Sequence, residues 1–144
     1  DEAERVLDRF SEIVKSELGS CEFSESIVDL RSKYEKTRWF VVSGGDEGEI
    51  RHSFRSRGLI GLFDGIYGGP ESEPEIFQMM KKNNLLISPC IYIGDSEFDH
   101  YSAKISGIDF LFVSEWSEFT GWRSYCSSNG IETVPSIDVL AEEV

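Results

Sequence analysis

The chain has 144 residues and a mass of 16.3 kDa, the size of one ordinary domain. Its hydrophobic fraction of 40% and aromatic fraction of 12% are too high for a disordered chain. The net charge of −13 repels polyphosphates and anionic lipids alike. Neither nucleic acid nor a membrane surface is therefore an expected partner.

The cysteines and the N-terminus suggest a reducing compartment. Cys21, Cys90 and Cys126 are widely spaced and include no CxxC pair, which favours three reduced thiols. The first ten residues are acidic and amphipathic, so they lack the basic and apolar regions of a signal peptide. No apolar run approaches the ~20 residues of a membrane-spanning helix. We expect a cytoplasmic protein.

Helical periodicity characterises the first part of the chain. Apolar residues from Ala3 to Leu18 recur at steps of three and four, which predicts an amphipathic helix ending at Gly19. A second helix is predicted from Ser24 or Ser26 to about Lys36. The pattern then changes to a short β-branched and aromatic run at 38–43, typical of a buried strand.

Strands and helices alternate from there to the C-terminus. Residues 46–57 are predicted to be helical, with Gly58 as the stop, and Ser72 begins the capping signature of another helix. We predict a buried strand at 90–93 ending at Gly94, a helix at 99–106, a buried strand at 110–113 and a last helix at 137–144, capped by Ser136. This alternation predicts an α/β fold with a doubly wound, mainly parallel sheet.

Ligands of open parallel sheets bind at the carboxyl ends of the strands. At the first candidate end, the hydroxyl of Ser43 is followed by Gly44 and Gly45, which allow the backbone to approach an anion before the next helix begins. The same Ser-Gly-Gly sequence is also an ordinary strand-to-helix turn. Taken alone, it favours the structural interpretation.

The second candidate end is Gly94-Asp95. Asp95 directly follows an apolar strand and Asp99 comes one helical turn later, so both carboxylates are within reach of one hard cation such as Mg²⁺. The structural alternative is an Asx turn at Asp95 and a helix N-terminal carboxylate at Asp99. The presence of the Ser43 turn at the end of a parallel strand weakens that alternative.

In this order, the two strand ends resemble the second and fourth motifs of the haloacid dehalogenase-like (HAD) hydrolases, which are mostly Mg²⁺-dependent phosphatases. Residues 63–69, FDGIYGG, are similar to a segment of the phosphoglycolate-phosphatase-like members, and residues 103–107 to the helix after the fourth motif. The resemblance implies a Rossmann-like core at 24–144 that lacks its first strand, preceded by the remnant of a helical cap at 1–23.

The resemblance also implies roles for individual residues. Ser43, with Gly44 and Gly45, would bind the phosphoryl group of a small phosphorylated substrate. Asp95 would bind Mg²⁺, and Asp99 would support the metal directly or through water. Two carboxylates are only part of a coordination shell, so weak Mg²⁺ binding is expected of this chain.

Two family features are missing from the sequence. The nucleophile of the family lies in an hhhhDxDG segment, and neither Asp1 nor Asp64 fits that pattern. The family's phosphate-neutralising lysine commonly precedes a proline that opens a helix, but here Glu73 occupies that position. Lys81 and Lys82 lie about two turns further along the predicted helix, so neither is expected to replace it. The isolated chain is therefore not expected to be a competent phosphatase.

Two functions remain. The chain is either part of a HAD-like phosphatase of small phosphorylated metabolites or a non-catalytic HAD-like pseudoenzyme that acts as a binding or interaction module, an alternative favoured by Glu73. In the family arrangement the first strand separates the strands ending at Ser43 and Gly94, so these two should not pair with each other. The exposed edges favour homo-oligomer formation or association with a missing N-terminal segment.

Overall fold

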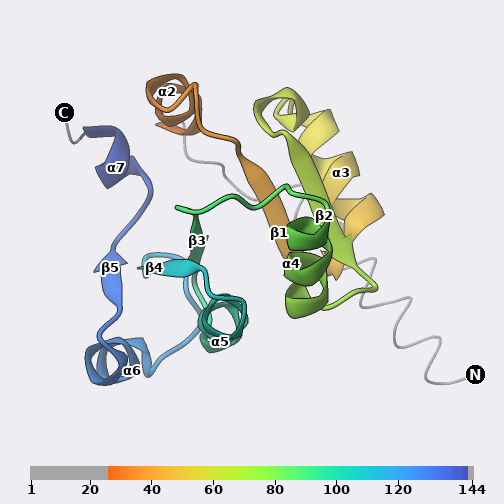
Figure 1. Cartoon of the computed structure of the whole chain (residues 1–144). Helices are drawn as coiled ribbons and strands as arrows, with labels where there is room; N and C mark the ends of the chain where they lie inside the picture. The colour runs from red at the N-terminus through yellow and green to blue at the C-terminus, as the bar shows by residue number, and fades with distance from the viewer. Residues whose placement is uncertain (1–25, 143–144) are drawn as a thin grey trace, which may run out of the picture. The chain divides into compact units, whose positions relative to one another are not determined.

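The computed structural model describes residues 26–142, which belong to two compact units (Figure 1). The first unit comprises residues 36–70, and the second comprises residues 26–35 and 71–142. Every described strand runs parallel to its neighbour, and helices connect the strands. The predicted α/β class with parallel strands is therefore confirmed.

The first unit is a strand–helix–strand crossover. Its elements are β1 (Phe40–Asp46), α3 (Glu47–Ser56), the 3-10 helix η1 (Ile60–Leu62) and β2 (Gly65–Gly69). Val41 pairs with Ile66, and the register shifts between Val42 and Asp46, where β1 continues past the predicted end at Ser43. The core of this unit contains Ile50 and Ile66, both buried.

Local signals set the bounds of α3. The Asp46 carboxylate accepts a 2.9 Å hydrogen bond from the Glu49 amide, which satisfies one of the open N–H groups of the first turn. Gly58 follows the helix with a φ of 69°, in the left-handed region that glycine adopts without strain. The helix predicted at 46–57 is thus confirmed to within one residue at each end.

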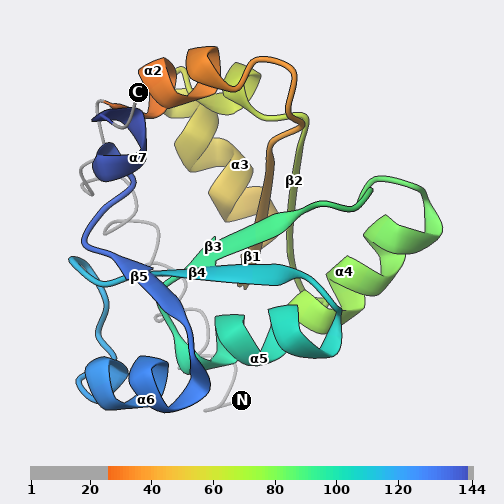
Figure 2. The same cartoon turned by 60° about the vertical axis from the view of Figure 1, so that its left-hand side comes forward.

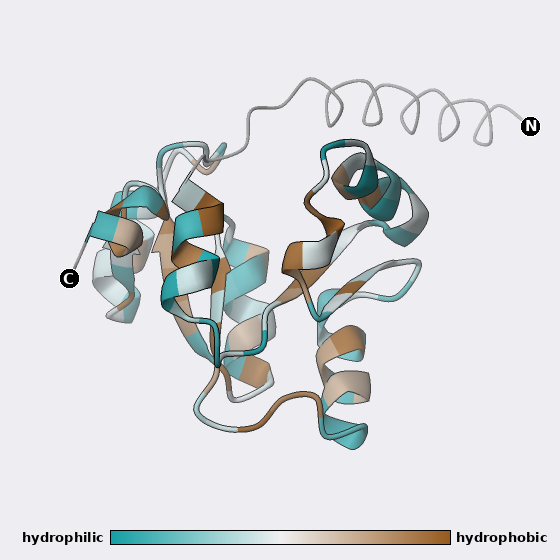
Figure 3. Ribbon diagram, turned by 90° about the horizontal axis from the view of Figure 1, so that it is seen from above, coloured by the Kyte–Doolittle hydropathy of each residue, from teal (hydrophilic) through white to brown (hydrophobic). Residues whose placement is uncertain are grey.

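The second unit contains a three-stranded sheet in the order β3-β4-β5 (Figure 2). Its elements are α2 (Ser26–Lys33), α4 (Glu73–Lys82), β3 (Ile91–Gly94), α5 (Glu97–Ile105), β4 (Asp109–Val113), α6 (Trp122–Asn129), β5 (Glu132–Val134) and α7 (Asp138–Glu142). Apolar side chains of α4, α5 and β4 make up most of its buried core: Ile76, Phe77, Met80, Ala103, Leu111 and Phe112. The mixture of hydrophobic and hydrophilic segments along the helices is visible in Figure 3.

Strand β3 is less buried than the sequence predicted. Tyr92 packs edge-on against Phe77 of α4, with ring centroids 5.0 Å apart. Ile91 and Ile93 point to the opposite face and are 57% and 38% exposed. The expectation of a buried strand was therefore wrong for Ile91 and Ile93, because burial alternates along β3 and only the Tyr92 side packs against α4.

Several predicted bounds also differ from the structure. The second helix begins at Ser26 but ends at Lys33, and α5 begins at Glu97 instead of Asp99. Helix α6 and strand β5 were not predicted. The helix predicted at 3–18 and the cap remnant at 1–23 lie outside the described residues.

Strands β1 and β3 belong to separate sheets among the described residues. This agrees with the expectation that the strands ending near Ser43 and Gly94 do not pair with each other. In the described range 26–142, no helix has the length and apolar character needed to cross a membrane.

Candidate functional site

The N-terminus of α5 brings Asp95 and Asp99 together. Ser96 is the N-cap, and its Oγ accepts a 3.0 Å hydrogen bond from the Asp99 amide. In return, Oδ2 of Asp99 accepts hydrogen bonds from the amides of Ser96 (3.0 Å) and Asp95 (2.9 Å). This reciprocal capping box turns the Asp99 carboxylate back toward the end of β3. The two carboxylates that the sequence singled out are therefore close neighbours.

Gly94 makes room for this turn. A Cβ atom on Gly94 would lie 2.6 Å from Oδ2 and 2.7 Å from Cβ of Asp99. Any larger residue would therefore displace Asp99. The glycine before Asp95 is needed for the position of the second carboxylate.

The loop after β4 supports Asp95 from another direction. Ser117 donates a 2.5 Å hydrogen bond from Oγ to the main-chain oxygen of Asp95, and the same Oγ accepts one of 3.2 Å from the Phe119 amide. The Asp95 side chain is exposed, and its pKa is raised by partial desolvation and then by the negative charge of Asp99. Sequence reasoning missed Ser117 because its partner is 22 residues away.

Glu73 adds a third carboxylate on the helical side of β3. It is the first residue of α4, it is only 5% exposed, and its Oε2 has no hydrogen-bond partner. Burial, and next the negative charge of Asp99, raise the pKa of Glu73 to about 7, while polar contacts with Ser102 and Tyr92 act in the opposite direction. Where the resemblance to the family would place a positively charged lysine, this chain has the buried carboxyl group of Glu73.

Tyr92 lies between these acids. Its hydroxyl donates a 3.4 Å hydrogen bond to Oδ1 of Asp99. Burial and the negative charges of Asp99 and Glu73 raise the pKa of Tyr92, so the phenol stays protonated and available as a donor. Tyr92 was not recognised from the sequence as a site residue, although its alternation with Ile91 and Ile93 places it on the helix-covered face.

Neither nearby lysine compensates for Glu73. Lys81 donates a hydrogen bond from Nζ to the main-chain oxygen of Ser106, beyond the C-terminal end of α5, whereas Asp99 lies in the first turn of that helix. Lys82 is the last residue of α4 and Glu73 the first, which separates them by about 13 Å along the helix axis. The expectation that neither lysine takes the family position agrees with this placement.

Ser43, Gly44 and Gly45 belong to the first unit, in the second half of β1. Oγ of Ser43 accepts a 3.1 Å hydrogen bond from the Gly45 amide, and a Cβ on Gly44 would have no atom within 4 Å. The hydroxyl proton of Ser43 remains available for donation. The predicted strand end at Ser43 was wrong, because Ser43, Gly44 and Gly45 lie within β1, in the part where its register with β2 shifts.

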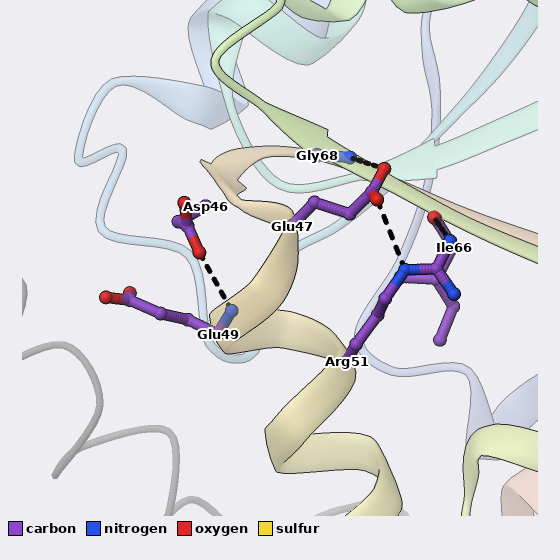
Figure 4. Close-up of polar contacts among 6 residues, drawn as sticks. All are labelled: Asp46, Glu47, Glu49, Arg51, Ile66 and Gly68. Carbon is purple, nitrogen blue, oxygen red and sulfur yellow. Dashed lines mark hydrogen bonds and ion pairs between the residues drawn. The ribbon is translucent and has the colours of Figure 1, made fainter.

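A polar network anchors α3, the helix that follows β1 (Figure 4). Oε1 of Glu47 accepts a 3.2 Å hydrogen bond from the Gly68 amide, and its Oε2 pairs with Nε of Arg51 at 3.2 Å. Arg51 also donates a 2.6 Å hydrogen bond to the main-chain oxygen of Ile66. These contacts attach the first turns of α3 to β2.

Asp64 has a structural role. Its Oδ2 accepts a 2.7 Å hydrogen bond from the Trp39 amide, and its own amide donates one of 2.7 Å to the Trp39 oxygen. The carboxylate holds the start of β1, which agrees with its rejection as a nucleophile.

The donor set beside β3 suits a hard cation. Asp95 and Asp99 supply carboxylate oxygens, and the unpaired Oε2 of Glu73 is buried next to Asp99. In the described part of the chain, no three His, Cys, Asp or Glu side chains already converge on a metal position. By their chemistry, the carboxylates of Asp95 and Asp99 alone fit a divalent cation, as part of its coordination shell.

The haloacid dehalogenase-like hydrolase family model matches residues 2–113. The chain belongs to this family. None of the curated protein sequences compared with it gives a significant match.

Solved structures of this family share the fold. A haloacid dehalogenase-like hydrolase from Streptococcus pneumoniae is 22% identical with a TM-score of 0.68, covering 86% of this chain and 61% of that one. A protein from Lactobacillus delbrueckii subsp. bulgaricus, assigned as a phosphoglycolate phosphatase, is 23% identical with a TM-score of 0.69, covering 98% and 62%. One from Clostridium acetobutylicum, assigned as a phosphatase, is 22% identical with a TM-score of 0.67, covering 83% and 58%. The chain thus spans about three-fifths of these proteins.

Proposed function

We propose that this chain provides the metal-binding and phosphate-binding parts of a phosphatase that hydrolyses monoesters of small phosphorylated metabolites. The observation that carries the proposal is the pairing of Asp95 and Asp99, fixed by the 2.9 Å hydrogen bond from the Asp95 amide to the Asp99 carboxylate at the end of a parallel strand. Family membership and the phosphatase assignments among the structural relatives support the reaction class.

The proposed roles follow from side-chain chemistry. Asp95 and Asp99 hold Mg²⁺, which when bound offsets the negative charge of the phosphoryl group. Ser43 donates its hydroxyl proton to a phosphoryl oxygen, and the exposed backbone at Gly44 and Gly45 allows close approach of the anion. Covalent catalysis also needs a carboxylate nucleophile, and the 144 residues contain no Asp-x-Asp sequence. The proposed reaction therefore requires a nucleophile from outside this sequence.

The test is complementation. The chain is produced together with a segment that carries an apolar strand ending in Asp-x-Asp-Gly, either joined to it or added as a separate peptide, and hydrolysis of p-nitrophenyl phosphate is measured with Mg²⁺ and with a chelator. We expect hydrolysis that needs Mg²⁺ and is lost in Asp95→Asn. Hydrolysis that is unchanged by Asp95→Asn would remove the support for the proposed site.

The second candidate is a non-catalytic binding module, and one observation favours it. The buried Glu73 adds negative charge where a phosphoryl group would be stabilised, which opposes both substrate and transition-state binding. In this case complementation gives no turnover, and Glu73→Lys in the complemented protein creates or raises it. Efficient hydrolysis with Glu73 in place would exclude this candidate.

A further inference from the structure

Helix α5 carries an apolar stripe on its outer side. Its inner side packs against β3 and β4, and Ser102 and Ala103 are fully buried there (Figure 2). Phe98, Tyr101 and Ile105 are 49%, 51% and 55% exposed, and their spacing of three and four residues places them on one side of the helix. The ring centroids of Phe98 and Tyr101 lie 6.0 Å apart. Apolar residues scattered singly are ordinary on a protein surface, whereas a continuous stripe favours contact with another surface.

Two opposite charges border the stripe. Glu97 lies in the first turn of α5 and Lys104 in the last turn, and both are exposed. Among the described residues, neither side chain forms an ion pair or a hydrogen bond with another residue. A helix turns by about 100° per residue, so Glu97 and Lys104 lie about 40° and 60° to one side of Tyr101. Phe98 and Ile105 lie about 60° and 40° to the other side. The outer side of α5 therefore has an apolar edge and a charged edge.

This side of α5 is complementary to itself when two copies meet antiparallel. A two-fold axis beside Tyr101 places the two Tyr101 rings together and the two apolar edges against each other. With a rise of about 1.5 Å per residue, Phe98 of one copy then faces Ile105 of the second copy. By the same symmetry Glu97 faces Lys104 of the second copy, and each contact occurs twice. A parallel two-fold pair would instead place each charged edge against the apolar edge of the other copy, which would bury charges without partners.

We propose that the outer side of α5 is the interface of a dimer of this chain, in which the two α5 helices pack antiparallel about Tyr101. The helix has nine residues, and one such helix covers less than the ~800 Å² per partner of a standard stable interface. The dimer is therefore weak and depends on protein concentration. The net charge of −13 on each copy opposes association, so the dimer forms more readily when salt screens that repulsion.

The test is sedimentation equilibrium of the whole chain at physiological salt and increasing protein concentration. We expect the weight-average mass to rise from 16.3 kDa toward twice that value. Glu97→Lys and Lys104→Glu each place like charges across the interface twice, so each should move dimer formation to roughly tenfold higher concentration. The double variant, Glu97→Lys with Lys104→Glu, restores opposite charges and the original net charge. We expect it to regain most of the dimer.

Glu115→Lys is the matched control for Glu97→Lys. Glu115 is an exposed acid in the loop after β4, the change in net charge is the same, and this variant should form the dimer at least as readily as the unsubstituted chain. Tyr101→Ser removes the ring at the axis and should abolish the dimer, while circular dichroism establishes that each variant is folded. A chain that stays at 16.3 kDa at every concentration would overturn the proposal. So would a folded double variant as monomeric as the single ones, or a dimer unaffected by Tyr101→Ser, which would use another surface such as the exposed side of β3.

Discussion

The hydroxyl of Ser117 donates a 2.5 Å hydrogen bond to the main-chain oxygen of Asp95, and this contact joins the loop after β4 to the end of β3. Asp95 is exposed and follows the last residue of the strand, so its backbone depends on such contacts for a fixed orientation. Ser117 is therefore a positioning residue: it holds the backbone of Asp95, and Asp95 supplies the carboxylate.

Loss of this hydroxyl should weaken metal binding more than it affects stability. In Ser117→Ala we expect Mg²⁺ affinity to fall several-fold, while the free energy of unfolding falls by only about 0.5–1.5 kcal/mol, the net value of one hydrogen bond. Ser117→Thr retains a hydroxyl and should restore most of the affinity. Calorimetry and urea unfolding measure the two effects, and an unchanged affinity in Ser117→Ala would contradict the positioning role.

Asp99 combines a structural and a chemical role that two substitutions separate. Asp99→Asn keeps an oxygen that can accept from the Ser96 and Asp95 amides but removes the charge, so we expect reduced Mg²⁺ affinity with a small loss of stability. Asp99→Ala also removes the capping acceptor and should cost about 1 kcal/mol more. Urea unfolding of both variants in a chelator checks the difference. Equal stability of the two would show that capping by Asp99 contributes little.

Because of Glu73, the free energy of unfolding of the metal-free protein should decrease as the pH rises. Its pKa in the folded state is about 7, above the ordinary value of 4.5, so between these values the folded state binds more protons than the unfolded state. The contribution of Glu73 is fully present below the ordinary pKa and is lost as the pH rises through about 7. From about pH 5 to about pH 8 we expect a loss on the order of 1–3 kcal/mol that is absent in Glu73→Gln. The free energy of unfolding of the unsubstituted chain and of Glu73→Gln is measured against pH in the presence of a chelator. The same dependence on pH in both proteins would contradict the prediction.

Gly68 fixes the approach of β2 to the start of α3. A Cβ atom there would lie 2.7 Å from the Gly45 oxygen and 2.8 Å from Cα of Glu47, both backbone atoms that cannot rotate away. Gly68→Ala should destabilise the protein by about 1–3 kcal/mol. Gly61→Ala is the control, because a Cβ at Gly61 would have no atom within 4 Å. Similar unfolding midpoints for both variants would show that the contact relaxes without cost.

The accuracy of the sequence predictions varied with how local the signals were. The Ser72–Glu75 capping box and the Gly58 stop are encoded within one helical turn, and the structure contains both. Helix α6 escaped prediction because its sequence, WRSYCSSN, has no apolar periodicity, although Gly130, with a φ of 63°, marks its end. Strand β5 has only three residues and too little pattern to identify.

The residues of the candidate site also differ in whether local sequence signals predict their positions. Asp95 and Asp99 are four residues apart, so their proximity follows from one turn of helix. The contributions of Ser117 and Tyr92 depend on packing between separate elements. The burial of Glu73 also depends on packing, here of α4 against the rest of the second unit, and a glutamate is otherwise expected at the surface.

The open side of β3 has a consequence for behaviour in solution. Ile91 and Ile93 are exposed on a strand at the edge of the described sheet, which is a surface prone to sticking to other chains. The net charge of −13 keeps identical molecules apart at low ionic strength. At 0.1 M salt, charges more than about 10 Å apart are largely screened from one another, so the repulsion weakens. The apolar attraction remains. Colloidal stability of this acidic protein should therefore be greatest in dilute buffer and decline as salt is added.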